Sequence, residues 1–369
     1  MKTYHAESAR AGLEAAARAG LSWEDFSFAA VELLERAIPF DSICIGLTDP
    51  ATHLITGRVM VDLEHSDEAL FVQYEYEVPD FNHFADLARR DVAVGILDEA
   101  TNGNRLHSPR QRDYLPTLGL EHELRGVVRS DERMWGVCTL YRAVGRVGFS
   151  PAEAQFMHRI ETTMALGLRR GLISANLEQT RRDTSSAAVV IFDGANEVIS
   201  ASDTAEERIA ELGGDLWGRL PSTITTVVSA ARAAAAGSAN YLPHLRLRSR
   251  SGEWLALHGT PVRDRNGLTT QIAVTIEAAG AAKVIPLVVE AYGLTDRERD
   301  VVQHVLLGDS TNQIAAALHL SPYTVQDHLK VIFEKVGVSS RRELSSRIFF
   351  SQYAGRLGGT LHADGWFND

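Results

Sequence analysis

Side chains capable of specific chemistry gather on one face of a short segment near the C-terminal end of the sequence. Apolar residues at helical spacing predict a helix here, and they form one row: Val325, Leu329, Ile332, Phe333 and Val336. The opposite face carries Gln326, Asp327 and Lys330, whose polar groups could reach base edges or phosphates of a nucleic acid. The alternative interpretation is a generic small helical bundle with a solvated charged face, which has the same periodicity.

The neighbouring sequence predicts the helices that would hold this polar face. Residues suited to begin a helix precede four segments: Thr295, Ser310, Ser321 and Ser340. Pro322 suits the first position of the polar-faced helix, whereas Gly308 and Gly337 are suited to end helices. Two short helices, a tight turn at 319–320 and a polar-faced helix are the parts of a helix-turn-helix.

Residue types recur at specific spacings through these helices. They are Leu294-Thr295-x-Arg297-Glu298-Arg299, Gly308, Gln313-Ile314-Ala315-x-x-Leu318, Ser321-x-x-Thr324-Val325-x-x-His328 and Lys335-x-Gly337-Val338-x-Ser340-Arg341. This pattern resembles the LuxR-type family of DNA-binding domains. The resemblance predicts a domain at 291–352, followed by a tail at 353–369.

The resemblance also implies residue roles. The third helix would enter the DNA major groove, where Gln326, Asp327 and Lys330 would read bases. A second set would contact or orient on phosphates: Thr324, His328 and Lys335. His328 has another interpretation, in which it packs against the preceding helix. The fourth helix would form the two-fold contact of a homodimer through a third set: Leu344, Arg347 and Ile348.

Composition argues against several other classes of protein. The sequence has only four lysines and none between Lys2 and Lys283, so we expect neither a phosphate-binding P-loop nor a phospho-acceptor receiver domain. We find no GxSxG, HExxH or metal-binding spacing, so we predict no enzyme activity, no cofactor and no metal. The net charge of −11 lies mainly in the first half of the chain, where it would repel DNA and weaken non-specific binding.

The sequence indicates a cytoplasmic location. No apolar run is long enough to span a bilayer, and the N-terminus lacks the apolar core of a secretory signal. The two cysteines, Cys44 and Cys138, form neither a zinc spacing nor a disulfide framework.

Residues 1–172 predict an α+β domain. We expect helices at 5–20 and 22–38, strands at 40–48, 54–61, 92–97, 122–130 and 134–143, and one long helix from Ser150 toward Arg182. Three stretches carry a resemblance to a GAF domain: Leu120-x-x-Glu123-Leu124-Arg125, Trp135-Gly136-x-x-x-Leu140-Tyr141-Arg142 and Gly148-Phe149-Ser150. This arrangement, with its arginine-rich composition, is similar to that of actinobacterial regulators with the same C-terminal domain.

A GAF-like fold implies that a small molecule could bind between sheet and helices. The residues that could line such a pocket are Cys44, Trp135, Cys138 and Tyr141. The alternative is that these residues belong to the core, as apolar and aromatic residues usually do. The two cysteines could meet on neighbouring strands, although inert buried thiols are the simpler interpretation.

Residues 185–279 predict a second α+β block in the order β-β-α-α-β-β-β, which resembles a degenerate PAS domain. In its third strand, predicted at 244–250, Arg246, Arg248 and Arg250 alternate with Leu245 and Leu247, as on a strand with one solvated and one buried face. An anion or an acidic partner could also bind these arginines. A linker is expected at 278–283.

The predicted fold class is therefore an α+β multidomain chain: GAF-like and PAS-like antiparallel-sheet domains followed by an all-α four-helix helix-turn-helix domain. The predicted function is a one-component transcription regulator that binds double-stranded DNA as a homodimer. A small-molecule effector and RNA polymerase are candidate further partners, and no membrane contact is expected. The alternative is a signalling or scaffold protein whose helical domain contacts protein, which the near-neutral charge of that domain supports.

Overall fold

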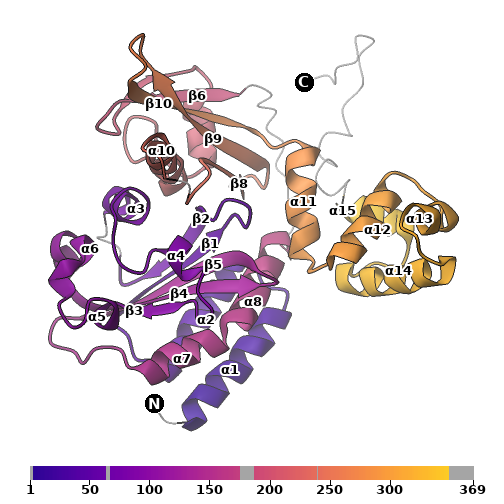
Figure 1. The fold of residues 1–369 in the computed structure, drawn as a ribbon, viewed down its shortest axis with the longest axis horizontal. Coiled ribbons are helices and arrows are strands. Elements are labelled where there is room, and N and C mark those ends of the chain that lie inside the picture. Colours follow the sequence, from indigo (N-terminus) through magenta and orange to yellow (C-terminus); the bar gives the residue numbers. More distant parts are fainter. Residues whose placement is uncertain (1–2, 64–66, 175–186, 239, 349–369) are drawn as a thin grey trace. The chain divides into compact units, whose positions relative to one another are not determined.

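The computed structural model describes residues 3–63, 67–174, 187–238 and 240–348 (Figure 1). Contacts divide the chain into two compact units, one of residues 1–175 and 184–278 and the other of residues 176–183 and 279–369. The predicted tail at 353–369 lies outside the described residues. No helix in the described ranges combines the length and the apolar character needed to cross a membrane.

The first block of the first unit is an antiparallel five-stranded sheet in the order β2-β1-β5-β4-β3. Its elements are α1 (Thr3–Arg18), α2 (Trp23–Ala37), β1 (Ser42–Thr48), β2 (Ile55–Val61), α3 (Glu68–Tyr76), α4 (Phe84–Leu87), β3 (Val94–Ile96), α5 (Leu97–Ala100), η1 (Arg105–His107), α6 (Pro109–Asp113), η2 (Leu115–Leu118), β4 (Leu120–Ser130), β5 (Arg133–Ala143), α7 (Pro151–Arg159) and α8 (Glu161–Ser174). Helix α8 packs on β4 and β5 and is joined there by α1 and α2.

We predicted one long helix beginning after Ser150. This prediction is wrong in one respect, because the helix is interrupted. Helix α7 ends at Ile160, where the backbone N–H bonds to the carbonyls of His158 and Phe156, and α8 begins at Glu161. The Glu161 carboxylate binds Arg129 of β4 and His158 of α7. Apolar residues continue at a spacing of four across this point, so periodicity alone does not reveal the break.

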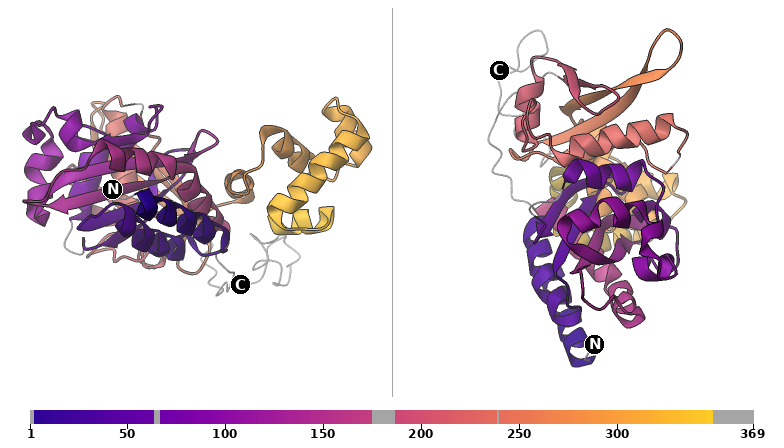
Figure 2. Two further views of the ribbon diagram at one scale, coloured as in Figure 1. Left: turned by 90° about the horizontal axis from the view of Figure 1, so that it is seen from below. Right: turned by 90° about the vertical axis from the view of Figure 1, so that its left-hand side faces the viewer.

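The second block has the predicted order of elements. They are β6 (Ala188–Phe192), β7 (Val198–Ala201), α9 (Ala205–Glu211), α10 (Ser222–Ala235), β8 (His244–Arg248), β9 (Trp254–Arg263) and β10 (Thr269–Ala278). The sheet is antiparallel in the order β7-β6-β10-β9-β8. Beyond the residues that pair with β8 and β6, strands β9 and β10 continue as a two-stranded arm (Figure 2). The fold class of the chain is thus α+β, with GAF-like and PAS-like antiparallel sheets.

One hydrophobic cluster runs through both blocks of the first unit. It includes Val72 and Tyr76 of α3 together with Val227 and Val228 of α10, and α3 packs directly on α10. This shared core follows from the composition of α10, in which nine residues are buried. A helix buried on this scale needs apolar neighbours on more than one side.

Arg246 departs from the expected solvated strand face. Its guanidinium binds the Asp49 carboxylate at 2.8 Å (Nε to Oδ2) and 2.6 Å (Nη2 to Oδ1). The Arg246 backbone N–H donates to Asp49 as well, at 3.0 Å. The acidic partner considered for the arginines of β8 therefore lies in the same chain, in the turn after β1.

The second unit is all-α. Its helices are α11 (Ala281–Ala291), α12 (Asp296–Leu306), α13 (Thr311–Ala317), α14 (Pro322–Val336) and α15 (Arg341–Ile348). The linker expected at 278–283 overlaps the start of α11, a helix that was not predicted and that contains Pro286. Val289 of α11 belongs to the same core as the four predicted helices, so this core begins before residue 291.

Candidate nucleic-acid interface

Helices α13 and α14 are joined by a tight turn. Leu318 ends α13, and His319 adopts a left-handed conformation with φ of 54°. The Leu320 N–H then bonds to the carbonyl of Ala315 at 2.8 Å, which closes the turn before Ser321 begins the next helix. A left-handed residue at this point reverses the chain within three residues, so that α13 and α14 pack against each other.

Caps and core contacts fix α14 in place. The Ser321 side chain accepts from the Thr324 N–H, and Gly337 ends the helix with φ of 71°. Its inner row belongs to the core of the unit, where Val325, Ile332 and Val336 are at most 4% exposed. Thr295 and Ser310, which we expected to begin helices, each form a capping box with the residue three positions later. The outer face of α14 is therefore carried by a rigid element.

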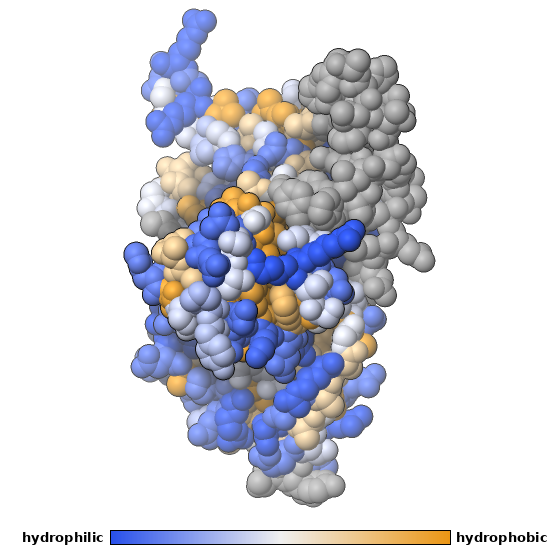
Figure 3. Space-filling view, turned by 90° about the vertical axis from the view of Figure 1, so that its right-hand side faces the viewer, coloured by the Kyte–Doolittle hydropathy of each residue, from blue (hydrophilic) through white to orange (hydrophobic). Residues whose placement is uncertain are grey.

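The outer face presents the polar side chains expected there. Gln326, Asp327 and Lys330 are exposed, and the side chains of Lys330 and Asp327 are 79% and 50% accessible. Their charged groups are 3.9 Å apart, which is a weak surface ion pair that leaves both free to bind elsewhere. Tyr323, at the start of the helix, is 72% exposed. Hydrophilic side chains predominate on the face of the molecule drawn in Figure 3, with smaller hydrophobic areas between them.

The three residues expected near phosphates have different surroundings. Thr324 lies at the N-terminus of α14, with its hydroxyl 2.8 Å from that of Ser321. His328 is half-buried one turn later. Lys335 instead binds within the protein, because its Nζ donates to Glu298 Oε2 at 2.7 Å and to the carbonyl of Gly293 at 3.2 Å.

Two of the residues expected at a dimer contact lie inside the domain. Leu344 and Ile348 are 0% exposed and belong to the core with Val301 and Val302 of α12. Both side chains are therefore part of the core of their own domain. Arg347, the third member of that set, is exposed on the outer side of α15. Two apolar residues four positions apart indicate that one face of a helix is buried. They do not indicate whether that face is covered by the same domain or by a second copy.

Two arginines of the resemblance motif have structural roles that sequence reasoning missed. Arg297 of α12 donates to the carbonyl of Leu318 at 2.5 Å, where α13 ends. Arg341 donates to the carbonyl of Asp309 at 2.7 Å and to the Thr311 hydroxyl at 3.1 Å, where α13 begins. Each therefore satisfies backbone groups at one end of α13. In the sequence, the position of both arginines beside predicted helix termini was the signal that could have indicated these roles.

A short helix, a tight turn and a second helix with an exposed polar face define a helix-turn-helix DNA-binding protein. Comparison with known families agrees, because residues 293–347 match the model described as "Bacterial regulatory proteins, luxR family". A transcriptional regulatory protein of Salmonella typhimurium, UhpA, is 34% identical over 142 residues, which cover 37% of this chain and 67% of that protein. The chain belongs to the luxR family and is a LuxR-type DNA-binding transcriptional regulator.

Other similarities are confined to shorter segments or are more distant. A probable transcriptional regulatory protein of Mycobacterium tuberculosis, NarL, is 41% identical over 61 residues, covering 16% of this chain and 26% of that protein. Among solved structures, SdiA of Escherichia coli is 11% identical with a TM-score of 0.27, covering 88% of this chain and 89% of that chain.

The residues expected to line a pocket are all buried, but they do not face one space. In the register of β1 and β5, Cys44 lies opposite Thr139 and Cys138 lies opposite Ile45. Since side chains of successive strand residues alternate between faces, the two thiols project to opposite sides of the sheet. Tyr141 shares the core cluster of Cys44, and Trp135 is 1% exposed. Burial raises the pKa of both thiols, so they stay protonated and unreactive.

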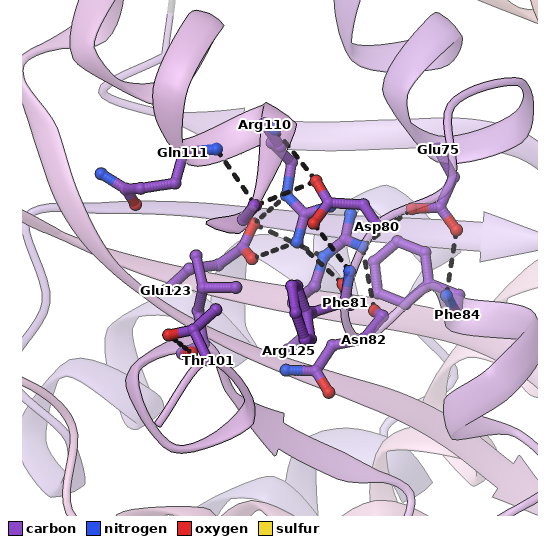
Figure 4. A network of polar contacts seen from close by, with 12 residues as sticks. Glu75, Asp80, Phe81, Asn82, Phe84, Thr101, Arg110, Gln111, Glu123 and Arg125 are labelled. Atoms are coloured by element: carbon purple, nitrogen blue, oxygen red, sulfur yellow. Dashed lines mark hydrogen bonds and ion pairs between the residues drawn. The ribbon is translucent and has the colours of Figure 1, made fainter. Parts of the chain in front are cut away.

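A buried ionic network lies between β4 and the α3–α6 side of the first block (Figure 4). Arg110 binds Glu123 at 2.7 Å and Asp80 at 3.2 Å, and Arg125 binds Glu75 at 2.8 Å. These five side chains are at most 1% exposed. The alternation of Glu123 and Arg125 along a predicted strand was the sequence signal for this network. Within the described residues no group of three or more potential metal ligands occurs.

Proposed function

We propose that this chain regulates transcription by inserting α14 into the DNA major groove as a dimer, under the control of a signal received through its first unit. The observation that supports this proposal most directly is the outer face of α14. There Gln326, Asp327 and Lys330 are exposed, while the inner row of the same helix is packed into the core of the unit. An α-helix fits the major groove, where every base pair presents a distinct pattern of donors and acceptors.

The outer face suits base reading through three chemically different groups. The Gln326 amide can both donate to and accept from adenine, and the Lys330 ammonium can donate to guanine. The Asp327 carboxylate can accept from the amino group of cytosine, and it would repel a phosphate. Asp327 and Lys330 lie one turn apart on the same exposed face, so both can reach into one groove.

Phosphate contacts are proposed for the N-terminal part of α14. The Thr324 hydroxyl lies in the first turn of α14, where the helix dipole favours an anion. His328 is half-buried one turn away and can donate from its ring. Lys335 is left out of this set because Glu298 and Gly293 already hold its ammonium group.

A dimer is proposed because each recognition helix reads only a half-site, and two half-sites supply the affinity and symmetry of an operator. Arg347 on the outer side of α15 is the member of the predicted contact set that a second copy could reach. A signal that changes the spacing of the two recognition helices would then change affinity for a given operator.

The test is operator binding by Lys330→Ala. Genome-wide mapping of bound DNA supplies the operator, and titration at several salt concentrations gives the dissociation constant and its salt dependence. We expect K330A to bind about 10-fold more weakly, because one base contact is worth about 1–3 kcal/mol. Arg112→Ala is the matched control, since Arg112 is an exposed cation of the first unit paired with its neighbour Asp113.

Two results would count against the proposal. An unchanged dissociation constant for K330A would remove α14 as the reading element. Binding of the wild type to duplex DNA without a salt dependence would favour the alternative of a scaffold that contacts protein, because phosphate contacts release counterions.

A further inference from the structure

A single tyrosine of the second block is inserted into the first block. In the loop between α10 and β8, Tyr241 is 5% exposed, whereas its neighbours Asn240 and Leu242 are exposed, the latter at 53%. Gly237 in the same loop adopts φ of 94°. Tyr241 is thus the buried anchor of an otherwise surface-exposed stretch among the residues described there.

The Tyr241 side chain fits into a slot of the first block, where polar groups contact its hydroxyl and an aromatic ring contacts its ring. The Tyr241 hydroxyl donates to Glu75 Oε1 at 3.1 Å, and a backbone hydrogen bond from Ala85 also reaches it. The rings of Tyr241 and Tyr76 meet edge to face, with centroids 4.7 Å apart. An acceptor, a donor and an aromatic ring therefore surround one phenol.

The Glu75 carboxylate is also held by contacts that do not involve Tyr241. The Phe84 N–H donates to the same Glu75 oxygen at 3.0 Å, and Arg125 binds the other oxygen at 2.8 Å. Arg125 is itself fixed, since its guanidinium lies 4.1 Å over the Phe84 ring. The carboxylate that recognises the phenol is therefore oriented in advance, as in a built binding site.

We propose that this slot is a binding site for a small aromatic molecule with a hydroxyl donor, and that Tyr241 is a tethered ligand which such a molecule displaces. A loop of a few residues gives its side chain an effective concentration of the order of millimolar. A free phenol therefore competes at millimolar concentration, and a larger aromatic ligand with extra contacts competes lower. This site is independent of DNA binding, so its test and the operator test can fail separately.

The first experiment uses full-length Tyr241→Ala with phenol, which is the part of the side chain beyond Cβ. Calorimetry should give saturable phenol binding to Y241A with a dissociation constant near or below about 1 mM. Benzene has the same ring without the hydroxyl and should bind at least about 10-fold more weakly, because Glu75 loses its donor. Tyr323→Ala, which removes an exposed tyrosine, should bind neither probe.

If Y241A does not fold alone, the readout is refolding in the presence of each probe. Phenol should then restore the folded far-ultraviolet signal in a saturable way, and benzene should not. Either no saturable binding to folded Y241A or no phenol-dependent refolding overturns the site. Equal effects of phenol and benzene would also overturn it, because the site would then be only an apolar hole.

The second experiment tests displacement in the wild type. Chymotrypsin can cut the Tyr241–Leu242 bond only when the Tyr241 ring has left its slot. Phenol at a concentration that saturates Y241A several-fold should accelerate this cut at least about 5-fold, and benzene should not. Cutting after Leu268, which is 64% exposed at the tip of the β9–β10 arm, serves as the internal control. A Tyr241–Leu242 bond that stays resistant would contradict displacement.

Discussion

Lys335 is a residue whose positive charge stabilises the fold and is therefore not available to bind DNA. It lies near the C-terminus of α14, and its partner Glu298 is the capping residue of α12, only 5% exposed. A buried carboxylate without a cation is costly, so this ion pair connects the two helices. We infer that Lys335 positions α14 and does not contact DNA.

Lys335→Met tests this inference, because methionine keeps much of the apolar stem and removes the charge. We expect K335M to lower the free energy of unfolding of the second unit by about 1–3 kcal/mol, since Glu298 keeps its burial and loses its cation. The salt dependence of DNA binding by the folded protein should be unchanged. K330M is the control that should alter binding at full stability. A reduced salt slope for K335M would instead support a phosphate contact.

The same variant has a defined pH dependence. Burial alone would raise the pKa of Glu298, but hydrogen bonds from Lys335 and from the Thr295 N–H outweigh it and lower this pKa below its ordinary value. The stabilisation is therefore complete above the unfolded pKa and disappears as the pH falls through the folded one. Urea unfolding from pH 6 to pH 3 should show the difference between wild type and K335M shrinking toward the acid end.

Among the secondary-structure elements, α15 belongs to the core of its own unit. Leu344 and Ile348 pack with α12 residues, and α15 also contacts α11. Leu344→Ala should therefore lower the free energy of unfolding by about 2–5 kcal/mol, as truncation of a fully buried leucine does. Denaturant unfolding at two protein concentrations measures this loss. A loss that vanishes at high dilution, where dimers dissociate, would show that Leu344 acts between copies.

The recognition elements were predictable from sequence because their signals are local. Each cap of α12, α13 and α14 lies within three residues of the N–H that it satisfies. The role of α15 was not predictable in this way, since Leu344 and Ile348 give the same periodicity against their own domain or a second copy. Helix α11 was not predicted either, and Pro286, normally a helix breaker, lies inside it.

Contacts between distant segments mark the limit of sequence reasoning at the scale of the whole molecule. Asp49 and Arg246 are 197 positions apart, and nothing in an Asp-Pro turn indicates an arginine on a strand of another block. The partners of Glu123 and Arg125 in the buried network are equally hidden, because Glu75, Asp80 and Arg110 come from separate helices and loops. The strands of both blocks were predicted in the correct order, but the short helices α3 to α6 of the first block were not predicted. The shared core depends on pairings that no local pattern encodes.

This shared core predicts that the two blocks of the first unit unfold together. Asp49 is 1% exposed and depends on Arg246, so Arg246→Met leaves a buried carboxylate with only backbone donors. We expect a loss of about 3–5 kcal/mol in the free energy of unfolding. Hydrogen exchange in increasing urea should show β1–β5 and β6–β10 losing protection at one midpoint, which lies lower in R246M than in the wild type.

Arg263→Met is the matched control, because Arg263 is exposed at the end of β9, and its midpoint should equal that of the wild type. If R246M instead unfolds β6–β10 while β1–β5 stays protected, the blocks are separate cooperative domains joined by a surface contact. If the two blocks share one unfolding midpoint, we expect them to move together as well. Any signal bound by either block is then transmitted by one rigid unit, because the free energy that holds Asp49 against Arg246 opposes their independent movement.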